Sequence, residues 1–493
     1  MSDKKYILTI GLEIHAELKT QTKMFCNSKN DPDEEKPNVN TCPVCMGHPG
    51  TLPVINKQAV KHVLSVGTAL GGELADFTEF DRKNYFYPDI PKGYQLSQYK
   101  YPLVSGGKLN GVLITRVHLE EDTATSLHEK GDLSAGEVGY SLVDFNRAGV
   151  PLMELVTEPV IQSAKEASNF ARELQLLMRC LKVSDANMEK GEMRVEANIS
   201  VSDKEGVFGT KVEVKNLNSF KAVERAIEYE FNRQVEALES GEKLSQETRG
   251  WDDAKQVTFS QRMKEESHDY RYFPDPDLPK LMISEIREFS SAELKKALPE
   301  LPWETRARLI KNFGDVMTEE SREIFVRIIP FGNYFSDVIA AFGGDSRFAK
   351  IAINYSTSDL VGLMKKDFGD SWEVRLPDVI AKIPPAQFAK LMRLVGENKI
   401  SSRGAKDILS SMYRDGGDPE VIANSNGLIQ KSDEGELKKI VQSIIEANPK
   451  VVADYKAGKE SVLQFLVGQG MKATKGSANP EMLANLIREA IFK

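Results

Sequence analysis

The sequence predicts an α+β protein in which a domain built on an antiparallel sheet precedes two all-α domains. Apolar and polar residues alternate strictly over 8–18 and again in three later segments, which indicates half-buried strands. From 293 onward, apolar residues recur at helical spacing instead. A segment rich in Gly, Asp, Asn and Ser then precedes a last group of short helices. We therefore expect domains at 1–292, 293–428 and 429–493.

Length and composition agree with a folded protein of several domains. The chain has 493 residues, more than one hydrophobic core usually organises, and 41% of them are hydrophobic. No apolar run is long enough for a membrane-spanning helix, and the first ten residues lack the apolar core of a signal peptide. We expect a cytoplasmic protein with no membrane partner. The net charge of −8 argues against a protein that coats nucleic acid by charge alone, while local recognition stays open.

Two long helices are expected within the first domain. Ser163 and Glu166 fit a capping box at the start of a helix over 162–181, and apolar residues then recur on one face. Residues 219–239 have the same spacing.

Acidic residues recur on the polar sides of the predicted strands. The first strand carries Glu13 and His15 on that side, and the strand over 115–121 carries Glu120, with Glu121 at its end. Two further strands carry Glu196 and Glu213. A merely solvated face needs charge, but it does not need carboxylates that alternate with histidine, asparagine and lysine.

Carboxylates that converge on one face repel each other, so a bound cation is the simplest physical explanation. Magnesium prefers oxygen ligands and keeps several waters, and one ion seldom takes more than three carboxylates. Two metal sites, or supporting roles for some residues, are therefore expected for Glu13, Glu120, Glu121, Glu196 and Glu213. His15 is a marginal magnesium ligand or an orienting donor.

A nucleotide held by such metals would need a binding site other than the two common glycine-rich loops. Neither a G-x-x-x-x-G-K-[ST] loop nor a G-x-G-x-x-G turn occurs. A sheet face can instead hold metal-bound phosphates while basic residues neutralise the remaining charge. The segment DRKNYFYPD supplies Lys83 beside Tyr85 and Tyr87, although the same residues could belong to a structural loop.

Four cysteines in a chain of this length do not indicate a disulfide framework. Cys42 and Cys45 form a CPVC motif, and Cys26 precedes it, so these three residues could bind zinc. A structural zinc site has four ligands, and Ser28 stands where a fourth cysteine would be expected. The alternative is a reduced remnant of a metal-binding knuckle.

Several blocks resemble one known family, the B subunits of bacterial aspartyl/glutamyl-tRNA amidotransferases. The signature VDFNRAGVPLMELVTEP, at 143–159, is similar to that of the family. GLEIHAEL, FDRKNYFYPD, HLEEDTAT, KVEVKNLNSF, QETRGWD and DYRYFPDPDLP follow the family's order, and FLVGQGMKATKGSANP resembles its tail. The resemblance is dense over the first 280 residues and poor over 340–375.

The resemblance implies a cradle domain with the fold shared by glutamine synthetase and guanidino kinases, a helical domain, and a tRNA-binding tail domain. Such subunits use ATP and magnesium to phosphorylate the side-chain carboxylate of Glu-tRNA(Gln) or Asp-tRNA(Asn). Ammonia then displaces the phosphate. A glutaminase (A) subunit supplies the ammonia, and a small C subunit braces the pair. An acyl phosphate provides the good leaving group that a carboxylate lacks.

Residue roles follow from the matching motifs. The metal ligands would be Glu13, His15, Glu121, Glu196 and Glu213, with Glu120 beside them. Lys83, Tyr85 and Tyr87 would lie near ATP, and Lys215 and Asn216 near phosphate or substrate. We also expect Glu121 or Lys83 to assist ammonia delivery, because ammonia must arrive unprotonated.

The chain departs from the family at several positions, and these keep alternatives open. Glu196 replaces the usual Asp, Val195 the usual Cys, and Ser28 the second Cys of the knuckle. A noncatalytic tRNA-binding scaffold is therefore the alternative function. The archaeal E-type paralogue is disfavoured because it carries a large inserted domain. A self-sufficient glutaminase is also disfavoured, since no cysteine has the context of a nucleophile.

Overall fold

The computed structural model describes residues 6–129, 139–263, 270–343, 345–429, 434–474, 478 and 480–492. The chain folds into two compact units, Met1–Leu301 and Pro302–Lys493, and the division into three domains stays a prediction. Helix α4 (Ser291–Ala297) packs against α1 (Lys57–Ala69) of the first unit. Among the described residues no single helix is long and apolar enough to cross a membrane, although the bent pair α6 and α7 meets that criterion when taken together.

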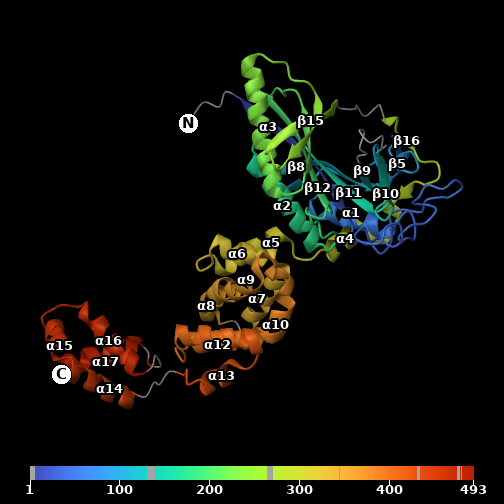
Figure 1. The fold of residues 1–493 in the computed structure, drawn as a ribbon. Coiled ribbons are helices and arrows are strands. Elements are labelled where there is room, and N and C mark those ends of the chain that lie inside the picture. The colour runs from blue at the N-terminus through green and yellow to red at the C-terminus, as the bar shows by residue number, and fades with distance from the viewer. Residues whose placement is uncertain are drawn as a thin grey trace. The chain divides into compact units, whose positions relative to one another are not determined.

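A ten-stranded sheet forms the centre of the first unit (Figure 1). Its order is β15-β14-β13-β12-β1-β11-β8-β6-β2, with β7 paired to β8. The strands are β1 (Ile7–Glu17), β2 (Glu73–Leu74), β6 (Val104–Ser105), β7 (Lys108–Leu109), β8 (Val112–Glu121), β11 (Pro151–Thr157), β12 (Met193–Ser202), β13 (Val212–Leu217), β14 (Glu247–Asp252) and β15 (Val257–Met263).

The sheet is mixed, which corrects the prediction of a purely antiparallel one. Strands β13 and β14 pair in parallel, because helix α3 (Phe220–Ser240) carries the chain across between them. The remaining pairs are antiparallel. The α+β class is confirmed, while the likeness to a glutamine synthetase cradle stays a prediction.

Apolar and polar residues alternate along β1, and the apolar side of the strand is buried. Ile10, Leu12 and Ile14 are at most 1% exposed, and they lie on the side that α2 (Ala164–Cys180) and α3 cover. The capping prediction for α2 is confirmed, since the Ser163 side chain accepts a hydrogen bond from the backbone N–H of Glu166. Helices thus cover one face of the sheet, and the polar side chains of β1 face the other.

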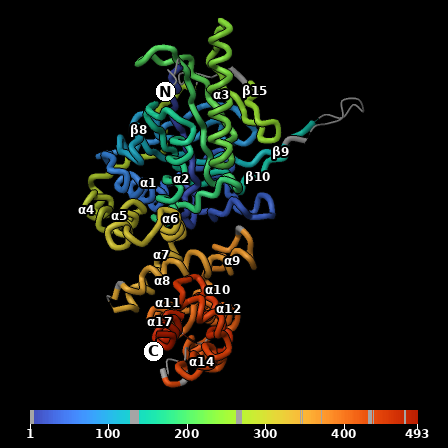
Figure 2. Tube along the Cα trace, turned by 90° about the vertical axis from the view of Figure 1, so that its left-hand side faces the viewer, coloured from blue at the N-terminus to red at the C-terminus, as the bar shows by residue number. Residues whose placement is uncertain are grey.

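Shorter strands form three small sheets beside the main one. Strands β9 and β10 make a hairpin that projects from the first unit (Figure 2). The strands are β3 (Phe77–Thr78), β4 (Asp81–Asn84), β5 (Tyr94–Ser97), β9 (Thr125–Glu129), β10 (Tyr140–Asp144), β16 (Phe273–Pro274) and β17 (Leu281–Met282). Of these, β4 and β5 are the ones that matter for the site.

The second unit is helical, as predicted, and the poorly matching segment 340–375 is helical too. It contains a π-helical turn, Tyr355–Leu360, between α8 and α9. Helices α14, α16 and α17 share a hydrophobic core around Leu437, Leu466 and Leu483. The helices are α5 (Pro302–Phe313), α6 (Glu319–Arg327), α7 (Ile329–Ala341), α8 (Ala349–Asn354), α9 (Val361–Phe368), α10 (Leu376–Lys382), α11 (Pro385–Gly396), α12 (Ser402–Asp415), α13 (Pro419–Ser425), α14 (Glu434–Ala447), α15 (Pro449–Lys456), α16 (Val462–Ala473) and α17 (Pro480–Phe492).

Candidate active site

Strand register places two histidines and one glutamate in one row across β1, β11 and β8. His15 lies opposite Glu154, and Glu154 lies opposite His118 on the next strand. Oε2 of Glu154 is 3.3 Å from Nε2 of His15 and 3.4 Å from Nε2 of His118. Glu120, two residues after His118, lies on the same side, with Oε1 3.5 Å from His118 Nε2. The fold therefore brings four side chains that are potential metal ligands into one patch.

A second carboxylate group lies beside this row. Glu13 is directly opposite Glu196, and Glu213 is on the following strand. One ligand oxygen from each of these three residues lies within 4.8 Å of the others. Nζ of Lys215 is 2.7 Å from Glu196 Oε2 and 4.0 Å from Glu213 Oε2, so the ammonium neutralises part of this charge.

The two groups are suited to two metal ions. Ligand atoms also lie within 4.8 Å of one another in the sets Glu13–His15–Glu154 and His118–Glu120–Glu154. The group at Glu196 offers only oxygen, as magnesium prefers, while the other set adds imidazole nitrogen, which is a poorer match for magnesium. The prediction that Glu13, Glu120, Glu196 and Glu213 converge on one sheet face agrees with this geometry.

The electrostatics of the site reflect crowded acids. Burial, together with the charges of Glu154 and Glu196, raises the pKa of Glu13 to about 7. Burial opposes protonation of His15, but the hydrogen bond and charge of Glu154 raise its pKa to about 9. The pKa of Glu154 falls although burial would raise it, because His118 and His15 face it. Without a cation, the ligands partly neutralise one another.

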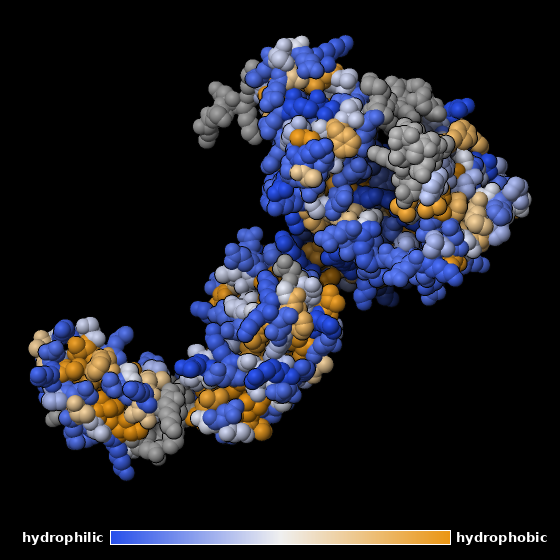
Figure 3. Space-filling view, in the orientation of Figure 1, coloured by the Kyte–Doolittle hydropathy of each residue, from blue (hydrophilic) through white to orange (hydrophobic). Residues whose placement is uncertain are grey.

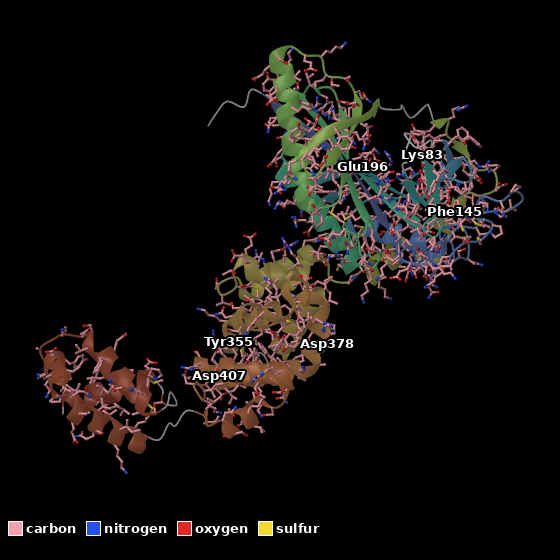
Figure 4. The ribbon with its side chains drawn as sticks, in the orientation of Figure 1. Lys83, Phe145, Glu196, Tyr355, Asp378 and Asp407 are labelled. Atoms are coloured by element: carbon pink, nitrogen blue, oxygen red, sulfur yellow. The ribbon has the colours of Figure 1, made fainter. Side chains whose placement is uncertain are left out.

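Most of these side chains line a cleft of about 230 Å³ in the first unit, and Figure 3 shows hydrophilic residues over much of the surface of this unit. Figure 4 shows Glu196 on the large sheet and Lys83 in the neighbouring strands. The lining residues are Glu13, Lys83, Ser97, Gln98, Tyr99, Arg116, His118, Glu120, Glu154, Glu213, Lys215, Thr248, Tyr270 and Tyr272. A space of this size is open to a charged small molecule.

Lys83, on β4, is brought to the cleft as predicted. Burial works against its charge, but Glu120 raises the pKa of Lys83 well above the usual value, so the side chain is a cation. Its Nζ lies 5.1 Å from the ring centroid of Tyr270 and 5.9 Å from that of Tyr85. Tyr99 and Tyr272, which stack at 4.3 Å between ring centroids, form an aromatic wall that the sequence interpretation missed.

Three predicted contacts, Tyr85, Tyr87 and Asn216, are not among the residues that line the cleft. Tyr87 is 51% exposed and packs edge-on against Tyr85 instead of lining the cleft. Tyr85 itself donates a hydrogen bond to Gln95. Asn216 is exposed, with a φ of 66°, which turns the chain after Lys215. The predicted roles of Tyr87 and Asn216 therefore stay predictions, which their positions outside the cleft lining do not support.

Glu121 is separated from the metal-binding groups, although Glu120 belongs to them. Consecutive strand residues point to opposite sides, so Glu121 faces away. Its carboxylate pairs with Lys92 and accepts a hydrogen bond of 2.9 Å from the backbone N–H of Leu96. Together with Lys92 and Asp122 it lines a separate cavity of about 20 Å³. The prediction of Glu121 as a metal ligand is not supported by this placement.

Glu154 was the main omission from the sequence prediction. Its neighbours on the same side of β11 are Leu152 and Val156, so no alternating polar pattern marks this strand. The signal that was available is a lone acid in an otherwise apolar strand, since an unpaired buried carboxylate is costly. The sequence prediction also gave no ligand role to His118, which lies on the same side of β8 as Glu120.

The three predicted zinc-binding cysteines do lie together. The sulfurs of Cys26, Cys42 and Cys45 are all within 4.8 Å of one another. The fourth position is occupied by the Ser28 hydroxyl, 3.9 Å from Cys45 Sγ. Because structural zinc sites use four cysteine, histidine or carboxylate ligands, the donor set does not complete such a site.

The comparisons with known proteins cover both units. Residues 8–287 match the family model "GatB/GatE catalytic domain", and residues 333–491 match "GatB domain". The B subunit of the aspartyl/glutamyl-tRNA(Asn/Gln) amidotransferase of Carboxydothermus hydrogenoformans is 42% identical over 99% of this chain and all of its own length. The proteins of the same name from Caldanaerobacter subterraneus and Gloeothece citriformis are 43% and 41% identical, over 99% and 98% of this chain and 100% and 97% of their own. The chain therefore belongs to the family of B subunits of glutamine-hydrolysing aspartyl/glutamyl-tRNA amidotransferases.

Proposed function

We propose that this subunit phosphorylates the side-chain carboxylate of Glu-tRNA(Gln), Asp-tRNA(Asn) or both, and then converts the acyl phosphate to the amide. The observation that carries this proposal is the convergence of two groups of potential metal ligands on one sheet face, around Glu154 and Glu196, beside a cleft lined by Lys83 and Lys215. Phosphoryl transfer needs cations on both sides of the moving group.

ATP and Mg²⁺ are the proposed cofactors. His118, Glu120 and Glu154 would hold one ion and Glu13, Glu196 and Glu213 the other, while His15 lies between the two groups, beside Glu13 and Glu154. Bound Mg²⁺ would neutralise charge on the phosphates of ATP and on the carboxylate that attacks. Lys83 and Lys215 lie at the edges of these groups and would bind phosphate oxygens, because both have raised pKa values.

The aromatic wall gives the cleft a second kind of surface. Tyr99 and Tyr272 present stacked rings beside Lys83, where a nucleotide base or the terminal adenosine of a tRNA could stack. Tyr85 would support Lys83 rather than contact ATP directly, since its hydroxyl is taken by Gln95. In this arrangement Lys83 and the aromatic wall would contact ATP, and neither Tyr87 nor Asn216 is needed for its binding.

The proposal requires partners. A glutaminase (A) subunit would supply ammonia, a small C subunit would stabilise the pair, and misacylated tRNA would bind the cleft by its acceptor end. The helices over 429–493 are proposed to contact the tRNA. A cytoplasmic location belongs to the same proposal, because aminoacylated tRNAs are used there.

Reconstitution tests the proposal directly. The protein is combined with the glutaminase and the small C subunit, ATP, MgCl₂ and either Glu-tRNA(Gln) or Asp-tRNA(Asn), and ADP and amidated product are measured. Misacylated tRNA should stimulate ADP formation, whereas deacylated tRNA should not. ADP formation that ignores misacylated tRNA, or amidation that proceeds without ATP, would contradict the proposal. A complex that binds tRNA but never forms ADP would identify the alternative, a noncatalytic tRNA-binding scaffold.

A further inference from the structure

The cysteine cluster is held by two loops that follow β1. Cys26 and Ser28 lie in the first loop, and Cys42 and Cys45 lie in a turn further along. The sulfurs of Cys42 and Cys45 are 3.8 Å apart. Cys45 is 7% exposed, while Cys26 and Cys42 are half-buried.

Several polar groups of the cluster surround one sulfur, that of Cys45, which also lies 3.4 Å from the carbonyl oxygen of Cys42. Sγ of Cys45 accepts the backbone N–H of Cys42 at 3.2 Å. Nζ of Lys23 lies 3.7 Å from the same sulfur, and the hydroxyl of Ser28 lies 3.9 Å away. Lys23 is fully buried, which is rare for a lysine and requires a partner for its charge.

This arrangement neutralises a sulfur anion without a metal. One ammonium faces one buried sulfur, so charge is balanced when Cys45 is a thiolate and the other two cysteines are thiols. The hydroxyl at Ser28 cannot provide the fourth thiolate that a closed zinc site would use. The family's metal-binding knuckle is therefore incomplete here, and the buried Lys23 provides the positive charge.

We propose that this cluster is a metal-free dithiol site that a hydroperoxide converts to a disulfide between Cys42 and Cys45. None of the residues of this cluster lines the cleft, although Cys45 also lines the small cavity that contains Glu121.

The chemistry balances in two steps. The Cys45 thiolate attacks the peroxide and becomes a sulfenic acid, while the other half of the peroxide takes up a proton and leaves as water or an alcohol. The sulfur of Cys42, 3.8 Å away, then attacks the sulfenic sulfur, and the displaced hydroxide takes the Cys42 proton to form water. Overall, the two sulfurs lose two electrons and the peroxide accepts them.

Lys23 connects the cysteine cluster to the turn at 145–149, which lies in the signature segment 143–159. Nζ of Lys23 also donates a hydrogen bond of 2.9 Å to the backbone carbonyl of Phe145. The N–H of Met24 donates to the carbonyl of Gly149 at 2.7 Å. This turn leads directly into β11, which carries Glu154. A disulfide would remove the anionic partner of Lys23 and alter the support of that turn.

Metal content provides the first test. The full-length protein, purified without chelators from zinc-supplemented cells, should contain almost no zinc, whereas Ser28→Cys, which restores a fourth thiol, should contain about one zinc per chain. The matched pair differs only in the replacement of one oxygen by sulfur. Stoichiometric zinc in the unmodified protein, resistant to dialysis, would overturn the proposal.

Peptide mapping provides the second test. After limited hydrogen peroxide, the peptide with Cys42 and Cys45 should be about 2 Da lighter and resist alkylation until a thiol reductant is added. Cys180, which lies in α2 with its sulfur near the carbonyl of Glu300, serves as the internal reference. Cys42 and Cys45 should react at least about tenfold faster than Cys180.

A Cys42 variant tests whether Cys42 and Cys45 are the two cysteines that form the disulfide. Cys42→Ser should abolish the disulfide and leave a sulfenic acid on Cys45 that a dimedone probe traps. Equal reactivity of Cys180, or a disulfide from Cys26 in the unmodified protein, would contradict the assignment.

Discussion

Oε2 of Glu154 lies 3.3 Å from Nε2 of His15, across the pairing of β1 with β11. This contact joins the strand that carries Glu13 to the strand that carries the signature segment. It also explains why a polar row survives inside the sheet, since each buried charge has a partner in the neighbouring strand. A bound metal would replace the contact by coordination to both residues.

The central position of Glu154 makes its substitution the sharpest test of the site. Glu154→Gln keeps the shape but removes the charge shared by His15 and His118. We expect kcat for Mg²⁺-dependent ADP formation to fall about 100-fold or more. Glu158→Gln, at a half-buried carboxylate that accepts a hydrogen bond from Thr115, is the matched control and should retain activity. Equal activity of the two variants would remove Glu154 from the metal site.

Metal affinity should depend on pH in a defined direction. Without metal, the pKa of Glu13 is about 7 and that of His15 is about 9, and both must lose a proton to become ligands. Affinity for Mg²⁺, or for Mn²⁺ as a spectroscopic substitute, should therefore rise from pH 6 to pH 9. Glu13→Gln should flatten the part of the curve near pH 7. An affinity that stays constant over this range would show that neither proton is linked to binding.

Substitution of Glu121 should affect the use of ammonia but not the binding of metal. Because Glu121 pairs with Lys92 in a cavity apart from the metal-binding groups, Glu121→Gln should leave Mn²⁺ affinity unchanged. If Glu121 accepts a proton from arriving ammonia, amidation should fall with both glutamine and free ammonia as donor. Full amidation with both donors would exclude this role, and a loss of metal affinity would contradict the observed separation.

The periodicity of the strands predicted much of the site, and its failures have specific physical causes. Alternation placed Glu13, Glu196 and Glu213 correctly because each lies on a strand with polar neighbours on the same side. Glu154 was missed because Leu152 and Val156 flank it on its own side. The parallel β13–β14 pair and the three small sheets depend on long-range contacts that no local pattern encodes.

A different prediction concerns the pH dependence of stability. Glu17, at the end of β1, faces Asp122, which forms a 3.0 Å ion pair with Arg194. Burial and the charge of Asp122 raise the pKa of Glu17 from 4.5 to about 8, so the folded protein keeps a proton that the unfolded chain releases. This stabilisation is complete below about pH 4.5 and is lost as the pH rises through about 8.

Glu17→Gln should remove that dependence, because the amide stays neutral and can still donate a hydrogen bond to Asp122. We expect the Tm of Glu17→Gln minus that of the unmodified protein to increase from pH 5 to pH 8 and to level off above it. Glu189→Gln, at an exposed glutamate near Arg194 in sequence, provides the control for a general charge effect. A difference in Tm that is independent of pH, or that matches the control, would show that Glu17 is ionised in the folded protein at neutral pH.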